Sequence, residues 1–485
     1  MRRSLVHRLA LLSLASAVFS LGCTNEDIVY RGGVNYAAPP AKAAGFIGYA
    51  DSLSQRPVCG SCHAEMLARW ASTKHAAAWS DLQASGHASS SCEGCHSVGA
   101  NGNASTDTLG GFASVKNYRY KDVQCESCHG PGLDHAALPG PTNRQLASIQ
   151  ADTGRKDGCG ECHTGTHDPF VDEWRRSGHA VTNATAHEST DPSCQACHTA
   201  QGALLAMGSS TNYKEKAAVQ PDMQSITCAV CHDSHGSPNP KQLRMPISSN
   251  SVDNNLCMKC HQRRGTVAEI TTRNSTHSPE GPTLLGTAGW YPPGVSTEPV
   301  VRPHGNPDIN SKLCAGCHVQ RYTVTDATTG LFAFQSTGHR FLATPCVDAN
   351  GQPTDDQSCA TTAKTYRSCV ASSCHSSEAN ALDRFVNGTA RILVLTNEVT
   401  RLTNLIKAGP RKAKCTFPYV GGYTSCLGAN FNLSLATKTG AAAHNEFLLE
   451  KLLNTSINQM KADYGLTGLL WAPTEQAPAQ LRSPR

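Results

Sequence analysis

Aromatic residues and long apolar runs are both scarce in this chain. Phe, Trp and Tyr make up 6% of its 485 residues and apolar residues of all kinds 39%, which is little for conventional cores at this length. Beyond the N-terminal segment, no stretch approaches the roughly 18 apolar residues that a membrane-spanning helix needs. We therefore expect a soluble mature protein whose interior is filled partly by something other than side chains.

Cysteine, in contrast, is abundant and clustered in close pairs. Eight times, two cysteines separated by two residues are followed at once by a histidine. This CxxCH pattern is typical of covalent haem c attachment, in which both thiols form thioethers to the haem and the histidine binds iron. Zinc is the main alternative, because CxxC pairs also build zinc ribbons, but zinc requires no histidine after each pair. The predicted haem-binding residues are Cys59, Cys62 and His63; Cys92, Cys95 and His96; Cys125, Cys128 and His129; Cys159, Cys162 and His163; Cys194, Cys197 and His198; Cys228, Cys231 and His232; Cys257, Cys260 and His261; and Cys314, Cys317 and His318.

One further pair departs from this spacing. In YRSCVASSCHSS, residues 366–377, Cys369 and Cys374 lie five positions apart and His375 follows directly. On a regular helix these cysteines would point about 140° apart, against about 60° for a CxxC pair, so the inserted residues have to bulge. The repeat described next favours a ninth haem here, with His375 as its iron ligand. A disulfide between Cys369 and Cys374 is the alternative, and it would leave eight haems.

The attachment motifs recur at a near-constant interval, which indicates a structural repeat. From Cys59 to Cys257, successive motifs lie between 29 and 35 residues apart. Three times an aromatic residue stands five positions before a histidine, in WASTKH, WRRSGH and FQSTGH, which end at His75, His179 and His339. This recurrence predicts that the three histidines are iron ligands.

Histidines outside the motifs are numerous enough to give every predicted haem a second axial ligand. If the segment is helical, His63 and His75 lie about 18 Å apart along the axis, too far to clamp one iron. The second ligand of each haem is therefore expected to come from another motif's segment, which links the haems into a chain. The predicted distal ligands are His75, His87, His135, His179, His235, His277, His304, His339 and His444, with His167 and His187 in reserve.

Four of the remaining cysteines lie outside any such motif. An even number in an exported chain favours two disulfides, Cys346 with Cys359 and Cys415 with Cys426. Free buried thiols are the alternative.

The first 22 residues have the features of an export signal, namely a basic start, an apolar run and small residues before Cys23. The stretch SLGC resembles the lipobox of bacterial lipoproteins, which implies a lipid on Cys23. Ordinary cleavage further upstream, leaving a free thiol, is the alternative. We expect an outer-membrane lipoprotein that faces the periplasm or the cell surface, or an extracellular protein.

The spacing of motifs and the change of composition along the chain predict its organisation. The expected fold is mainly α with extensive coil, built around a covalently attached haem chain, with little or no β-sheet. The expected parts are a signal peptide (1–22), an N-terminal tether (23–57), a three-haem module (58–157), a four-haem module (158–262), an irregular module with one or two haems (263–380) and a helical region (381–485).

These motifs also carry a family resemblance. CGSCHAEMLARWASTKHAAAW is similar to the multihaem segment of the cytochrome c-552/c-554 type, and CESCHGPGLDH and CAVCHDSHGS resemble stretches of bacterial periplasmic and outer-membrane multihaem cytochromes. The likeness covers about residues 58–375. It implies bis-histidine haems and electron transfer, but the superfamily contains both carriers and reductases.

Two classes of function follow, an electron carrier and a reductase of nitrite, hydroxylamine or a sulfur oxyanion at one five-coordinate haem. The chain has no CxxCK motif and has more histidines than the haems need, which favours the carrier. The expected partners are other redox proteins or an extracellular electron acceptor, and the outer membrane through the lipid. A filament of identical subunits is a further alternative. The net charge of +5 turns negative once each haem adds two propionates, so no nucleic-acid partner is expected.

Overall fold

The computed structural model describes residues 45–468, apart from 52, 100, 103–109, 152–157, 166–167, 186–187, 189, 210–211, 218–222, 327 and 372–373. The predicted signal peptide, the lipid site at Cys23 and the two reserve histidines, His167 and His187, lie outside the described residues. No helix in the described part of the chain is both long and apolar enough to cross a membrane.

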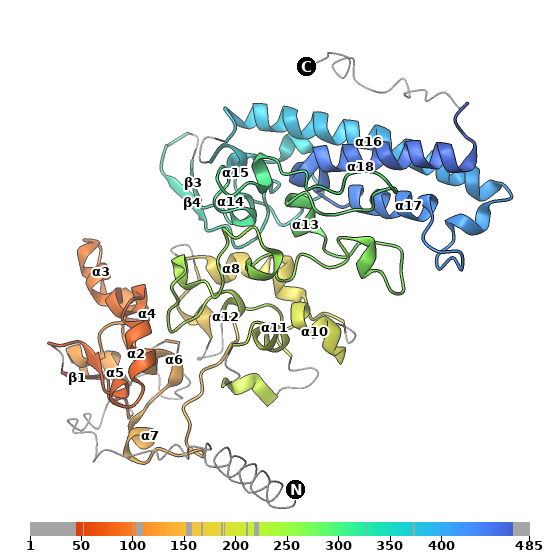
Figure 1. The fold of residues 1–485 in the computed structure, drawn as a ribbon. Helices are drawn as coiled ribbons and strands as arrows, with labels where there is room; N and C mark the ends of the chain where they lie inside the picture. The colour runs from red at the N-terminus through yellow and green to blue at the C-terminus, as the bar shows by residue number, and fades with distance from the viewer. Residues whose placement is uncertain are drawn as a thin grey trace, which may run out of the picture.

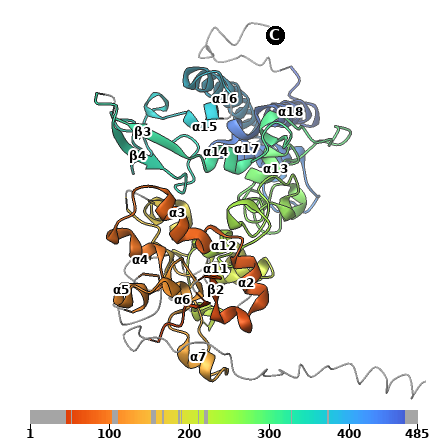
Figure 2. The ribbon, with the colours of Figure 1, turned by 90° about the vertical axis from the view of Figure 1, so that its left-hand side faces the viewer.

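The described residues between 45 and 370 form mainly short helices joined by coil (Figures 1 and 2). Several of these helices are the haem motifs themselves, because each CxxCH segment closes a single helical turn. The short helices are α2 (Ala64–Trp70), α3 (Ala78–Ala84), α4 (Glu93–His96), α5 (Gly111–Val115), α6 (Cys125–His129), α7 (Leu133–Ala137), α8 (Phe170–Arg175), α10 (Pro192–His198), α11 (Ala200–Ala206), α12 (Cys228–Cys231), α13 (Glu280–Leu284), α14 (Cys314–His318) and α15 (Arg367–Val370).

Two small antiparallel hairpins are the β-structure of the described residues. Strand β1 (Tyr49–Asp51) pairs with β2 (Arg56–Pro57), and β3 (Tyr322–Thr325) pairs with β4 (Phe332–Ser336). The expected class, mainly α with extensive coil and little sheet, is confirmed.

A three-helix bundle ends the described chain and holds the largest apolar core. It consists of α16 (Glu378–Ala408), α17 (Ser425–Ala436) and α18 (Ala441–Tyr464), which lie together in Figure 1. Leu402, Leu435 and Leu452 are among its fully buried side chains. The helical periodicity of the sequence predicted this region. The bundle packs conventionally because its helices, unlike the haem modules, have apolar faces long enough to bury one another.

Both predicted disulfides are present. Cys346 is bonded to Cys359, and Cys415 is bonded to Cys426 beside the start of α17.

The segment expected to be an unstructured tether is packed from residue 45 onward. Phe46, Ile47 and Tyr49 are fully buried. The carboxylate of Glu126 accepts hydrogen bonds from the backbone N–H groups of Ile47 at 3.0 Å and Gly48 at 2.7 Å. The short apolar run GFIGY is therefore an edge of the first haem module and not part of the tether, which corrects the boundary at residue 57.

Candidate haem sites

All nine predicted attachment motifs line one continuous internal space of about 6080 Å³. A pocket for a single small ligand occupies roughly 300–1,000 Å³, so this space matches several large cofactors. The apolar clusters outside the C-terminal bundle are small, with four to seven buried residues each. The expectation that something besides side chains fills the interior agrees with this geometry. We number the sites 1 to 9 in chain order, starting at Cys59.

At sites 1, 4, 6, 7 and 9 the motif closes on itself by a backbone hydrogen bond that brings the first cysteine and the histidine together. At sites 1 and 6 the histidine N–H donates to the carbonyl oxygen of the first cysteine at 2.9 Å. At site 9 the His375 N–H donates to the Cys369 carbonyl oxygen at 3.1 Å, although two more residues lie between them. This bond is equivalent to the one that closes a CxxCH motif, which supports the interpretation of this stretch as a haem site.

Eight of the nine motif histidines face a histidine from elsewhere in the chain. The ring centroids of these pairs lie 6.0 to 6.3 Å apart. The pairs are His63 with His135 (site 1), His129 with His235 (site 3), His163 with His75 (site 4), His198 with His277 (site 5), His232 with His339 (site 6), His261 with His179 (site 7), His318 with His444 (site 8) and His375 with His304 (site 9).

This spacing fits an iron ion between two imidazoles. Metal–imidazole bonds of about 2 Å hold the two ligating nitrogens about 4 Å apart. Adding the distance from each ring centre to its nitrogen gives a centroid spacing of about 6 Å, the value found in all eight pairs. The residues present therefore fit haem iron bound by two histidines.

Burial keeps several of these imidazoles neutral, as metal ligation requires. Removal from water lowers the pKa of His75, His179, His339 and His444 to about 4 each, with a further lowering from the facing histidines. A neutral imidazole has a free nitrogen lone pair for iron.

Two segments of the chain match known protein families. Residues 58–130 match the family of cytochrome c554 and c-prime, and residues 221–266 match the doubled CXXCH motif. Both matched segments contain predicted haem-attachment motifs. No curated protein matches the chain.

Two solved structures are similar to this chain. One is the outer cell wall cytochrome OcwA, with 19% identity and a TM-score of 0.49, covering 76% of this chain and 75% of that one. The other is an undecahaem cytochrome from the S-layer of Carboxydothermus ferrireducens, with 22% identity and a TM-score of 0.42, covering 78% of this chain and 56% of that one.

The repeat seen in the sequence corresponds to a repeated structure. The indole N–H of Trp70 donates to the Val123 carbonyl oxygen at 2.9 Å, and that of Trp174 donates to the Ile226 carbonyl oxygen at 2.8 Å. Each acceptor lies two residues before the second haem motif that follows the Trp. The histidine five residues after each Trp then faces the first site of the following unit, site 4 for His75 and site 7 for His179.

In the third copy of this pattern, the histidine faces a site that precedes it in the chain and not one that follows it. His339 faces His232 of site 6, which precedes it in the chain. Glu173 of α8 holds it there, because its buried carboxylate accepts hydrogen bonds from the backbone N–H groups of Thr337 at 2.8 Å and His339 at 2.7 Å, and from the Thr337 hydroxyl at 2.8 Å.

We expect Glu173→Gln to loosen this contact. The amide replaces one acceptor oxygen by a donor that faces N–H groups, and leaving a buried donor without an acceptor costs about 1–3 kcal/mol. Thermal unfolding should begin at a lower temperature, and the haem of site 6 should gain high-spin character in the electron paramagnetic resonance (EPR) spectrum. Glu65→Gln, at an exposed position of α2, is the control. An unchanged spectrum in Glu173→Gln would show that His339 is held by other contacts.

Cysteines of different motifs lie close enough to interact electrostatically, and this proximity indicates which sites adjoin. Site 1 interacts with site 3, site 3 with 4, site 4 with 6, site 6 with 7, site 7 with 8 and site 8 with 9. Site 2 joins this series at site 4 through Cys95 and Cys162, and site 5 joins it at site 7 through Cys197 and Cys260. The sites therefore form a line of seven with two side branches.

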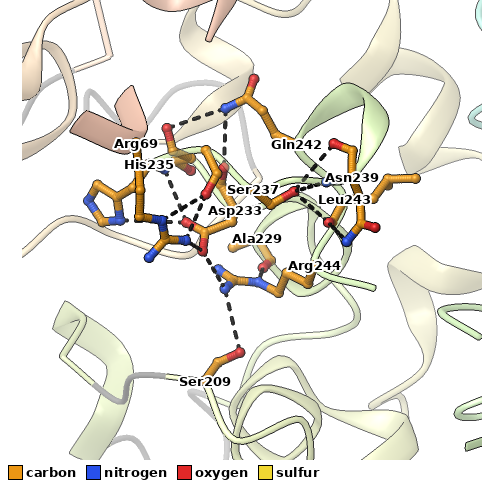
Figure 3. A network of polar contacts seen from close by, with 12 residues as sticks. Arg69, Ser209, Ala229, Asp233, His235, Ser237, Asn239, Gln242, Leu243 and Arg244 are labelled. Carbon is orange, nitrogen blue, oxygen red and sulfur yellow. Dashed lines mark hydrogen bonds and ion pairs between the residues drawn. The ribbon is translucent and has the colours of Figure 1, made fainter. Parts of the chain in front are cut away.

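A polar network fastens the first haem module to the second (Figure 3). Arg69 of α2 donates to the Asp233 carboxylate at 2.5 Å and to the Gly236 carbonyl oxygen at 2.7 Å. Arg244 donates to the same carboxylate at 3.3 Å. Burial opposes ionisation, but the hydrogen bond from His235 and the charge of Arg244 hold the pKa of Asp233 well below its usual range. The network fixes the loop that carries His235 to site 3.

Two of the predicted distal ligands, His304 and His444, meet at the junction with the C-terminal bundle. Asn445 has non-helical backbone angles, and its side chain accepts the N–H of Leu448 at 3.0 Å, so regular α18 begins only after it. His444 stands just before this start and points to site 8. The Nδ1 atom of His304 bonds to the Ala443 carbonyl oxygen at 2.7 Å, which couples the ligand of site 9 to the same junction.

Site 2 differs from the other eight. Within the part of the chain that the structure describes, no second histidine ring pairs with His96 as the other motif histidines are paired. His87, the ligand predicted for this region, lies exposed in the turn after α3 and lines the same internal space. In the equivalent site 5, the partner of His198 is His277 from the long irregular excursion.

Proposed function

We propose that the chain is a multihaem c-type cytochrome that carries electrons along nine covalently attached haems, eight of them bound by two histidines. The observation that carries this proposal is the set of eight histidine pairs at 6.0 to 6.3 Å, each with its members drawn from different motif segments. Two strong ligands leave no position for a substrate, so such haems exchange electrons only. The neighbouring thiols support short distances between successive haem edges.

The cellular setting that we propose is outer-membrane or extracellular respiration. The export signal, the lipobox-like SLGC and the long line of sites support transfer from periplasmic redox proteins to an acceptor outside the cell. Protease treatment of intact cells of the native host tests this. We expect loss of the full-length protein from intact cells without lysis, and full protection would place it on the periplasmic side.

EPR spectroscopy of the oxidised holoprotein tests the coordination. We expect low-spin ferric signals that integrate to eight haems per chain. Integration to four or five low-spin haems would contradict the proposed electron carrier.

His96, which no other described histidine faces, favours a second candidate function at site 2. Its Nδ1 atom bonds to the Ala78 carbonyl oxygen at 2.8 Å, which leaves Nε2 for iron, as at the other motifs. Site 2 also stands at the end of a side branch, where a haem receives electrons without lying on the through route. A haem at this position with an exchangeable sixth ligand suits reduction of nitrite, hydroxylamine or a sulfur oxyanion.

Cyanide binding distinguishes the two functions of site 2. We expect one cyanide per chain to bind the oxidised holoprotein and to convert one high-spin signal to low-spin. Absence of binding, with nine low-spin haems, would assign site 2 to electron transfer alone.

A further inference from the structure

The nitrogen of each motif histidine that does not face iron has a definite hydrogen-bond partner at most sites. When Nε2 binds iron, Nδ1 carries a proton and donates. The acceptor is a backbone carbonyl oxygen at sites 2, 3, 5, 6 and 8, belonging to Ala78, Gln145, Thr182, Lys241 and Phe341. At site 9 it is the side-chain oxygen of Asn380.

At sites 4 and 7 the acceptor is a carboxylate. His163 Nδ1 bonds to Asp168 Oδ2 at 2.7 Å, and His261 Nδ1 bonds to Glu280 Oε2 at 3.4 Å. These two sites occupy the same place in the repeat, since each faces a histidine from the turn that follows the Trp-containing helix of the preceding unit.

Backbone contacts hold both carboxylates in position. The His163 carbonyl oxygen accepts the N–H of Val171 at 3.0 Å, and the His261 carbonyl oxygen accepts the N–H of Gly281 at 2.8 Å. Each bond ties the start of a short helix, α8 or α13, to the histidine that its carboxylate contacts. The carboxylates are thus built into the sites.

Two other carboxylates near ligand imidazoles have different surroundings. Glu188 lies 3.5 Å from His198 Nδ1, whose nearer acceptor is the Thr182 carbonyl oxygen at 3.0 Å. Asp233 lies 3.6 Å from His235 Nδ1, but two arginines neutralise its charge. Within the described residues, neither Asp168 nor Glu280 forms an ion pair with Lys or Arg.

Sites 4 and 7 are also the two branch points. Site 4 interacts with sites 2, 3 and 6, and site 7 interacts with sites 5, 6 and 8. By this proximity of thiols, sites 4 and 7 each adjoin three other sites.

A carboxylate on Nδ1 makes the imidazole a stronger electron donor, and its negative charge stabilises the more positive ferric state. In a site removed from water this interaction is screened weakly. We propose that Asp168 and Glu280 set the reduction potentials of the haems at sites 4 and 7 below those of their neighbours. An electron leaving site 3 or site 6 then crosses an uphill step at each branch point. The two steps separate the chain into segments that hold electrons. This inference rests on the proposed haem chain.

Spectroelectrochemical titration of Asp168→Asn and Glu280→Gln holoprotein tests it. In each variant we expect the reduction potential of one low-potential haem to rise by at least 59 mV. For one electron this is a tenfold change in the equilibrium constant. The shift should be larger for Asp168→Asn, because its hydrogen bond is shorter. The EPR g-values of that haem should change with the potential.

Asp172→Asn is the matched control, because Asp172 bonds to Thr164 and Gly165 and to neither ligand. Equal titration curves for Asp168→Asn and Asp172→Asn would overturn the inference. A wild-type titration with fewer than nine one-electron components would instead count against the proposed haem chain itself, so the two failures are distinguishable.

Discussion

A variant in which both Cys159 and Cys162 are replaced by alanine is expected to hold eight haems and to lose electron transfer through site 4. In the described structure, site 4 is the connection of site 3 and of site 2 to the rest of the line. Glu65 is an exposed position in the first module, and Glu65→Cys attaches the protein to a gold electrode there. With no other substitution, all of its haems should exchange electrons with the electrode. In the variant without a haem at site 4, only the haems of sites 1 and 3 should exchange electrons with the electrode at fast scan rates.

The matched control removes a haem from a side branch. Replacing Cys194 and Cys197 by alanine also leaves eight haems and a comparable internal void, but site 5 only joins the line at site 7. All eight remaining haems should then respond at fast scan rates. If the site 4 variant responds as completely as the site 5 variant, the branched order is wrong.

Replacing His444 by alanine is expected to convert the haem of site 8 from low-spin to high-spin. His444 faces His318 at 6.2 Å, and its burial lowers its pKa to about 4, so it is a neutral imidazole placed for iron. The low-spin EPR intensity should fall by one haem per chain, and one new cyanide-binding position should appear.

His87→Ala supplies the comparison. His87 was predicted from the sequence as a distal ligand, but its ring pairs with no motif histidine in the described part of the chain. We expect no change in low-spin intensity. A loss of one low-spin haem in His87→Ala would show that His87 binds site 2 and would remove the second candidate function.

The sequence predicted the nature of the sites better than their connections. The CxxCH spacing is local, so motif turns follow directly from the residues, and the two disulfides join cysteines only 13 and 11 positions apart. Partners of histidines depend on tertiary contacts. His339 occupies the same repeat position as His75 and His179, yet Glu173 holds it on the preceding site 6.

The carboxylates at the branch points were beyond sequence reasoning for a similar reason. Asp168 follows its histidine by five positions, whereas Glu280 follows its own by 19, so the two share no spacing. The buried run after Gly45 was missed because Glu126, 79 positions away from Ile47, holds it in place.

Intact mass spectrometry of the holoprotein tests the central claim most directly. The internal space is lined by nine motifs, and the ninth closes on Cys369 as a CxxCH turn does and presents His375 to His304. We expect the mass of the processed chain plus nine haems. A mass of the chain plus eight haems, with Cys369 and Cys374 joined in a disulfide, would contradict it.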